Sequence, residues 1–310
     1  MTQQPKQTPP AADRFRGIYP MLYAFFRRDG RLDREAMRLQ VEACIAAGAH
    51  GMAALGLATE VDKLSLAERH QILEWVVADV AGRVPVAITV FGNTAAEQID
   101  FVTAAAQAGA DWVILQPPRI DDLSEQDCAA LFGAVMEASP LPVAIQNAPE
   151  FLGFGLSAES IASLRRAHDT FVVLKGEGPV VQIERVIDAT AGQLKVFNGR
   201  NGLELPDNLR AGCAGIIPTP ESCRAQVRIF ELMQSGRPED ETEAERLYRE
   251  ILPALVFAMQ SLESLHCYGK RMLAWTIGLD EVFDRAPCLE PSAFGLACAK
   301  RHAETLCRPQ

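Results

Sequence analysis

The sequence of 310 residues contains no apolar run near the ~20 residues that a membrane-spanning helix needs. Its opening stretch, MTQQPKQTPPAADR, is polar and lacks the apolar core of a secretory signal peptide. Basic residues are in deficit as well: the net charge is −10, so the chain as a whole repels nucleic acids and anionic membranes. These absences predict a cytoplasmic protein that binds neither, with a flexible tail over residues 1–16.

Metal and nucleotide motifs are also missing. The eight cysteines include no CxxC pair, and no spacing of cysteine and histidine suits zinc. We therefore expect reduced cysteines that mostly fill the core. Neither the GxGxxG fingerprint of a dinucleotide site nor the GxxxxGK[ST] pattern of a phosphate-binding loop occurs. We expect no metal and no cofactor.

Eight short apolar runs do recur along the chain, with helical patterns between them. Most runs are continuous rather than alternating, which is typical of parallel strands buried on both faces. Capping boxes at Ser65–Glu68 and Thr94–Glu97 mark the starts of two intervening helices. The runs occupy residues 17–26, 51–56, 84–92, 111–118, 141–149, 171–177, 194–199 and 214–219.

Eight strand–helix units predict an α/β fold, a TIM (β/α)8 barrel, over residues 17–235. An open doubly wound sheet is the alternative, but that class usually carries a glycine-rich phosphate loop after its first strand, where this chain has FFRRDG. Residues 236–310 are predicted to form further helices packed on the barrel, because no linker separates them as an independent domain.

The stretch FVVLKGE, residues 171–177, places a lysine at the end of the sixth predicted strand. Active sites of TIM barrels lie where the strands end, and partial loss of hydration there favours the neutral amine of a lysine. Lys175 is therefore a candidate for forming a Schiff base with a ketone. Glu177 follows two residues later on the same strand face, so the pattern alone leaves a structural Lys175–Glu177 ion pair equally open.

Several short motifs, in a fixed order between about residues 17 and 300, carry a family resemblance. They are GIYPMLYAFFRRDGRLD, GLATEVDKLSLAER, GRVPVAITVFGNT, GADWVILQPP, LPVAIQNAP, VVLKG and LRAGCAGII. With these motifs the chain resembles the dihydrodipicolinate synthase / N-acetylneuraminate lyase family of class I, Schiff-base aldolases. The resemblance implies a TIM barrel with C-terminal helices, a homotetramer, a 2-keto acid such as pyruvate as substrate, and Lys175 as the Schiff-base lysine.

The chain departs from the family pattern at the second and fifth strands. The family has Gly-Thr/Ser-Thr-Gly-Glu where this chain has GLATE, so Leu57 and Ala58 replace the hydroxyls that help to hold the keto-acid carboxylate. Backbone N–H groups at these positions can still bind a carboxylate, and Thr59 either restores one hydroxyl or serves the turn. Gln146 stands where the family has a proton-shuttling tyrosine, and glutamine cannot carry a proton.

Another group must then move the proton, and Glu177 is our candidate. Alternatively, Glu177 serves only as a counter-ion of Lys175. Phe151 aligns near the arginine by which synthases bind the carboxylate of their aldehyde substrate. Arg119 is either a substitute for that arginine or a solvated loop residue.

Two further positions at strand ends, Gly199 and Ile217, are expected to contact the substrate. The motifs QNAP and KGEGP together resemble those of the L-2-keto-3-deoxyarabonate dehydratases, which break a C–O bond through the imine. We therefore predict a Schiff-base lyase, most specifically a 2-keto-3-deoxy-sugar-acid dehydratase. The alternatives are a pyruvate-dependent aldolase or synthase, and a keto-acid-binding protein that has lost turnover.

Overall fold

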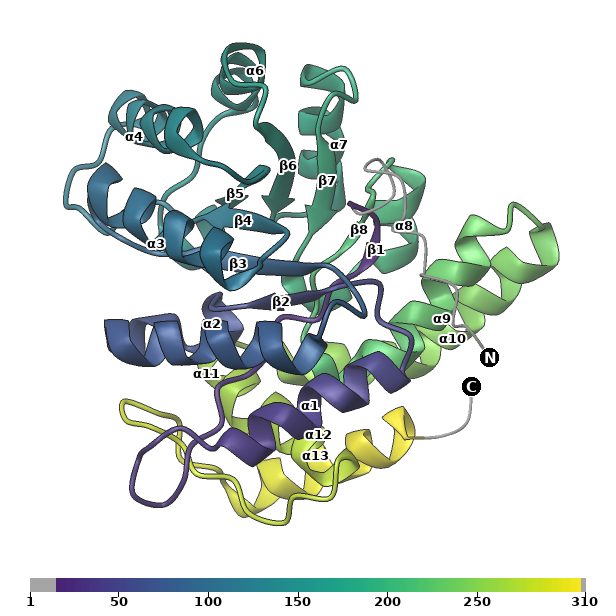
Figure 1. The fold of residues 1–310 in the computed structure, drawn as a ribbon. Coiled ribbons are helices and arrows are strands. Elements are labelled where there is room, and N and C mark those ends of the chain that lie inside the picture. Colours follow the sequence, from purple (N-terminus) through teal and green to yellow (C-terminus); the bar gives the residue numbers. More distant parts are fainter. Residues whose placement is uncertain (1–14, 308–310) are drawn as a thin grey trace, which may run out of the picture.

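A computed structural model describes residues 15–307 of the chain. The described residues form eight strands in one parallel sheet, in the spatial order β1-β8-β7-β6-β5-β4-β3-β2, and each apolar run singled out in the sequence contains one strand (Figure 1). Of the tail expected over residues 1–16, all but Phe15 and Arg16 lie outside the described residues. The strands are β1 (Gly17–Ile18), β2 (Met52–Ala54), β3 (Val86–Val90), β4 (Trp112–Leu115), β5 (Val143–Asn147), β6 (Phe171–Gly176), β7 (Lys195–Asn198) and β8 (Gly215–Ile216).

The segment that contains β1 closes this sheet into a barrel. On one edge, β1 pairs in parallel with β8. On the other edge, the Leu22 N–H donates to the Ala53 carbonyl of β2 at 2.8 Å, and the Ala53 N–H donates to the Pro20 carbonyl at 2.9 Å. Each strand thus has a partner on both sides, and the predicted TIM barrel is confirmed.

Helices join successive strands and cover the outside of the barrel (Figure 1). Ser65 and Thr94 cap α2 and α3 with the reciprocal bonds to Glu68 and Glu97 that the two capping boxes predict. The helices of the barrel are α1 (Arg34–Ala46), α2 (Leu66–Val80), α3 (Ala95–Ala108), α4 (Glu125–Ala138), the short α5 (Pro149–Leu152), α6 (Ala158–Ala167), α7 (Val180–Ala189), α8 (Leu205–Arg210) and α9 (Cys223–Gln234).

Aromatic side chains fill part of the barrel interior. Tyr19, Trp112 and Phe197 are fully buried, and their ring centroids lie 5.4 to 6.0 Å apart in edge-on or tilted contacts. Trp112 is the first residue of β4, whereas Phe197 lies in register with Lys175, so the cluster extends from the start of the strands toward their carboxyl ends. Active sites of this fold lie at the carboxyl ends of the strands, so we expect the site there.

The chain after α9 adds helices that pack against the barrel. They are α10 (Pro238–Ala258), α11 (Leu262–Ser264), which runs through a π-helical turn over Leu265–Gly269 into α12 (Lys270–Thr276), and α13 (Ala293–Leu306). Figure 1 shows α12 and α13 beside α1 of the barrel, where the three helices share the wall of one groove. No helix within residues 15–307 combines the length and the apolar character that crossing a membrane requires.

Lys270 ties these added helices to the loop that follows β2. Its ammonium group pairs with Glu60, and both side chains are buried, with 0% and 1% exposed. The second oxygen of Glu60 lies 2.6 Å from Lys63 Nζ. Burial acts to raise the pKa of Glu60, but the charge of Lys270 and the hydrogen bonds from Lys270 and Lys63 outweigh it, so the pKa is lowered. The pair therefore anchors the 3₁₀ turn η1 (Leu57–Thr59), which directly precedes Glu60.

We expect Lys270→Ala to lower the free energy of unfolding by about 3 kcal/mol, because the substitution leaves a buried carboxylate with only Lys63 as a counter-charge. Urea unfolding monitored by circular dichroism measures this loss. Arg246→Ala, which removes exposed ion pairs on α10, is the matched control and should cost about 1 kcal/mol or less. Equal losses in the two variants would contradict the anchoring role of Lys270.

Candidate active site

A buried ion pair stands at the carboxyl end of β6. Lys175 lies within β6, in register with Gln146 of β5 and Phe197 of β7, and Glu177 follows directly after the strand. Lys175 Nζ lies 2.8 Å from Glu177 Oε1, and only 5% and 7% of the two side chains are exposed. The alternation of a strand places residues two apart on one face, so the sequence K-G-E is sufficient to bring the two charges together.

A chain of amide side chains orients the carboxylate of this pair. Gln146 Nε2 donates to Glu177 Oε1 at 2.6 Å, and Gln116 Nε2 donates to Gln146 Oε1 at 2.8 Å. Gln98 in turn donates to the Gln116 carbonyl at 3.0 Å. The bond from Gln116 fixes the amide of Gln146 so that its NH₂ group faces Glu177. Gln116 was not among the predicted site residues; its one signal in the sequence is its position directly after a strand.

Gly199 gives Glu177 the space that its carboxylate needs. A Cβ at position 199 would lie 2.6 Å from Glu177 Cγ and 2.7 Å from Cδ, which real side chains do not tolerate. The sequence predicts that Gly199 allows close approach of the substrate. In the structure the side chain that approaches Gly199 closely is that of Glu177.

The pair opens into a small cavity of about 360 Å³, part of which is open to solvent. The predicted residues Leu57, Ala58 and Ile217 line it together with Lys175 and Glu177. The other lining residues are Met21, Phe151, Arg200, Asn201, Pro218, Thr219, Met259, Leu262 and Leu265. The last three come from the helices after the barrel or the turn between them, so the C-terminal extension forms part of the wall.

The turn after β2 presents backbone rather than hydroxyl groups to this cavity. Leu57 and Ala58 are the first residues of η1, where a helical turn leaves N–H groups without an internal partner. The hydroxyl of Thr59 is buried and donates to the Leu22 carbonyl at 2.6 Å, so it serves the turn and does not restore a hydroxyl to the cavity. His266 Nε2 lies 2.9 Å from the Leu57 carbonyl and supports the turn from the π-helical segment.

The arginines after β4 and β7 differ in their relation to the cavity. Arg119 is half-exposed, lies 3.7 Å from Asp62 and is not among the residues that line the cavity, which favours a loop arginine over a substitute for the carboxylate-binding arginine. Arg200 lines the cavity with 18% of its side chain exposed, and Glu204 and Glu150 hold it at 3.0 and 3.4 Å.

Metal ligands are absent from this site: within residues 15–307, no three His, Cys, Asp or Glu side chains are grouped as a metal ion requires. The described cysteines are all free thiols, and six of the eight are buried. The chemistry that the described residues offer is therefore that of an amine beside a carboxylate, with amide and hydroxyl groups around them.

Comparisons with known proteins identify the family and agree with the fold. The model of the dihydrodipicolinate synthetase family matches residues 14–290. The 4-hydroxy-tetrahydrodipicolinate synthase of Methanothrix thermoacetophila is 30% identical over 248 residues, which cover 79% of this chain and 82% of that protein. The synthase of the same name from Rhizobium meliloti is 31% identical over 208 residues, covering 66% of this chain and 70% of its own.

Solved structures show the same fold. A Pseudomonas aeruginosa protein assigned to the dihydrodipicolinate synthetases superposes with a TM-score of 0.87 at 26% identity, covering 94% of this chain and 99% of that one. The family member YagE from E. coli K12, solved in complex with pyruvate, superposes with a TM-score of 0.83 at 24% identity, covering 94% and 98%. The chain therefore belongs to the dihydrodipicolinate synthetase family and is a lyase of the class that works through a lysine Schiff base.

Proposed function

We propose that this protein is a hydro-lyase that removes water from a 2-keto-3-deoxy sugar acid through an imine on Lys175. The observation that carries the proposal is the carboxylate of Glu177, 2.8 Å from Lys175 Nζ and held by Gln146. Glutamine stands where the family pattern has its proton-shuttling tyrosine. The four tyrosines of the chain are all described, and none lines the cavity, so Glu177 is the carboxylate available for proton transfer beside the lysine.

The first step is formation of the imine. Glu177 takes a proton from the Lys175 ammonium group, and the neutral amine attacks the C2 ketone of the substrate. The carbinolamine loses its hydroxyl as water and becomes an iminium. The C1 carboxylate of the substrate is held by the backbone N–H groups of Leu57 and Ala58, two residues that line the cavity.

Elimination follows from the electron demand of the iminium. Glu177 removes a proton from C3, and the electron pair of the C–H bond moves into the iminium to form an enamine. The enamine returns the pair and expels the hydroxyl at C4, which takes the proton back from Glu177 and leaves as water. A second water then hydrolyses the unsaturated imine and frees Lys175. One carboxylate thus serves as base and acid in turn.

The second candidate is a pyruvate-dependent synthase or aldolase, in which the enamine attacks an aldehyde instead of losing a hydroxyl. The names of the relatives favour this candidate more directly than they favour dehydration. The residues of the cavity favour dehydration, because Phe151 lies in its wall near where the synthases have a carboxylate-binding arginine. The homotetramer and the cytoplasmic location stay predictions.

Incubation with pyruvate and borohydride, followed by intact mass measurement and peptide mapping, tests the imine. We expect one reduced adduct, located at Lys175, and none in Lys175→Ala. Absence of the adduct in the wild-type protein would contradict every Schiff-base mechanism.

The reaction type is read from the products of a 2-keto-3-deoxypentonate, followed by NMR. Dehydration removes one water and leaves the carbon chain intact, which is the outcome we expect. Release of pyruvate would identify the aldolase candidate instead. An adduct without turnover of any 2-keto acid would identify a binding protein.

Glu177→Gln keeps the shape of the side chain and removes its ability to carry a proton. We expect the pyruvate adduct to form, while kcat for dehydration falls by about 10² to 10⁴. Gln116→Leu is the companion variant: it leaves Glu177 in place but frees the amide of Gln146, so kcat should fall by a smaller factor. Wild-type kcat in Glu177→Gln would show that the carboxylate is only a counter-ion of Lys175.

A further inference from the structure

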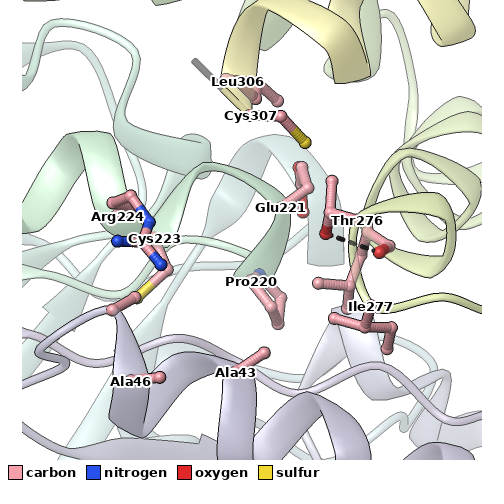
Figure 2. A pocket seen from close by; sticks show the side chains of 12 residues that line it. Ala43, Ala46, Pro220, Glu221, Cys223, Arg224, Thr276, Ile277, Leu306 and Cys307 are labelled. Atoms are coloured by element: carbon pink, nitrogen blue, oxygen red, sulfur yellow. Dashed lines mark hydrogen bonds between the residues drawn. The ribbon is translucent and has the colours of Figure 1, made fainter. Parts of the chain in front are cut away.

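A second hydrogen-bonded cluster lies beside the catalytic pair. It consists of Tyr23, Asn201, Thr219 and Glu221, all buried. Asn201 and Thr219 line the catalytic cavity. Glu221 lies in the wall of a separate groove between α1, α9, α12 and α13, where Figure 2 shows it together with Thr276 and Cys307. Glu221 therefore stands behind two residues of the cavity wall.

Three donors converge on the carboxylate of Glu221. Tyr23 Oη donates to Oε2 at 2.9 Å, while Thr219 Oγ1 and Asn201 Nδ2 lie 2.7 and 2.9 Å from Oε1. No ion pair within residues 15–307 includes Glu221. Burial raises the pKa of Glu221 and that of Tyr23. A buried carboxylate without a cation is costly to folding, so its presence here indicates a role in the site that it supports.

The hydrogen bonds determine how the amide of Asn201 and the hydroxyl proton of Thr219 are oriented. The backbone N–H of Thr219 can only donate, and it lies 3.0 Å from Asn201 Oδ1, so that atom is the amide oxygen and the NH₂ group faces Glu221. The Thr219 hydroxyl has one proton and two acceptors, Glu221 Oε1 at 2.7 Å and Asn201 Oδ1 at 2.8 Å. A carboxylate is the stronger acceptor, so the proton points to Glu221.

We infer that Glu221 is a positioning residue that makes Asn201 and Thr219 into a binding site for a hydroxyl group of the substrate. With its proton held by Glu221, Thr219 presents an oxygen that accepts, and the second N–H of Asn201 remains to donate. A hydroxyl donates and accepts, so it satisfies both. A carboxylate has no proton for Thr219 and would lie near the charge of Glu221. The inference rests on the proposed function, whose substrate carries hydroxyls beyond its keto group, and adds the residues that recognise one of them.

The backbone around Asn201 supports a constrained site. Arg200, Asn201 and Gly202 all have left-handed conformations, with φ of 50°, 54° and 78°, which is unfavourable for the two residues with side chains. Gln226 donates to the Asn201 carbonyl at 3.0 Å, and a Cβ at Gly202 would lie 2.5 Å from Gln226 Oε1. Gln226 holds the main chain of Asn201, and Glu221 holds its side chain.

The test is competition against pyruvate in borohydride trapping, which reports affinity without requiring turnover. Two competitors of equal chain length are compared: a 2-keto-3-deoxypentonate, which has hydroxyls, and 2-oxopentanoate, which has none. The wild-type protein should prefer the first. Glu221→Ala should reduce this preference about tenfold or more, because it weakens the 2-keto-3-deoxypentonate more than 2-oxopentanoate.

Matched variants separate positioning from general stability. Thr219→Val should lose the preference and Thr219→Ser should keep it, since only the hydroxyl matters. Glu221→Gln, which keeps an acceptor oxygen, should fall between Glu221→Ala and the wild-type protein. In the double variant Glu221→Ala with Thr219→Val, the preference should fall by less than the product of the factors measured in the two single variants, because both residues act on one site.

Three results would overturn the inference: no preference in the wild-type protein, equal weakening of both competitors in Glu221→Ala, or no difference between Thr219→Ser and Thr219→Val. If Glu221→Ala fails to fold, the comparison of Thr219→Ser with Thr219→Val still decides the test. A wild-type protein that shows the preference but dehydrates no keto acid would refute the proposed function and leave this inference standing.

Discussion

The site depends on the buried contact between Lys175 and Glu177. Removing two charges from water is costly, and the cost is offset only where geometry and further hydrogen bonds are good. Here the carboxylate accepts from Lys175 at 2.8 Å and from Gln146 at 2.6 Å on the same oxygen. Its other oxygen lies toward Gly199. These contacts come from β5, from β6 and from the end of β7, so the barrel holds the pair in place.

The C-terminal helices support the cavity at the carboxyl ends of the barrel strands. The turn that carries Leu57 and Ala58 is held from outside by Lys270, which pairs with Glu60, and by His266, which bonds the Leu57 carbonyl. Burial lowers the pKa of His266, which favours the neutral ring, and a bond to a carbonyl requires its Nε2 to carry a proton. The added helices thus contribute part of the cavity wall and also hold the turn that carries Leu57 and Ala58.

The sequence predicted the fold and the proximity of Lys175 and Glu177 because both follow from local patterns. Continuous apolar runs mark the buried parallel strands, and the rule that barrel strands end at the site singles out Lys175 and Glu177. Gln116 escaped prediction because its role exists only through a hydrogen bond to Gln146 on the next strand. No periodicity in the sequence records such a bond.

Other residues escaped because their positions depend on packing between distant segments. Met259, Leu262 and Leu265 have the pattern of ordinary core residues, and nothing local shows that they cover the barrel mouth. The sequence left two roles open for Thr59, a hydroxyl in the cavity or a bond within the turn. The structure shows the second, because the hydroxyl donates to the Leu22 carbonyl. Glu221 belongs to the same group, because two of its three donors, Tyr23 and Asn201, come from other segments of the chain.

Exchange of the methyl protons of pyruvate in D₂O, followed by ¹H NMR, tests the central claim most directly. The exchange requires the imine and a base at C3, and it needs no knowledge of the natural substrate. We expect the wild-type protein to exchange these protons, while Glu177→Gln still forms the borohydride adduct with pyruvate yet exchanges the protons at least about 10²-fold more slowly. Equal exchange rates in the two proteins would contradict the assignment of Glu177 as the group that moves the proton.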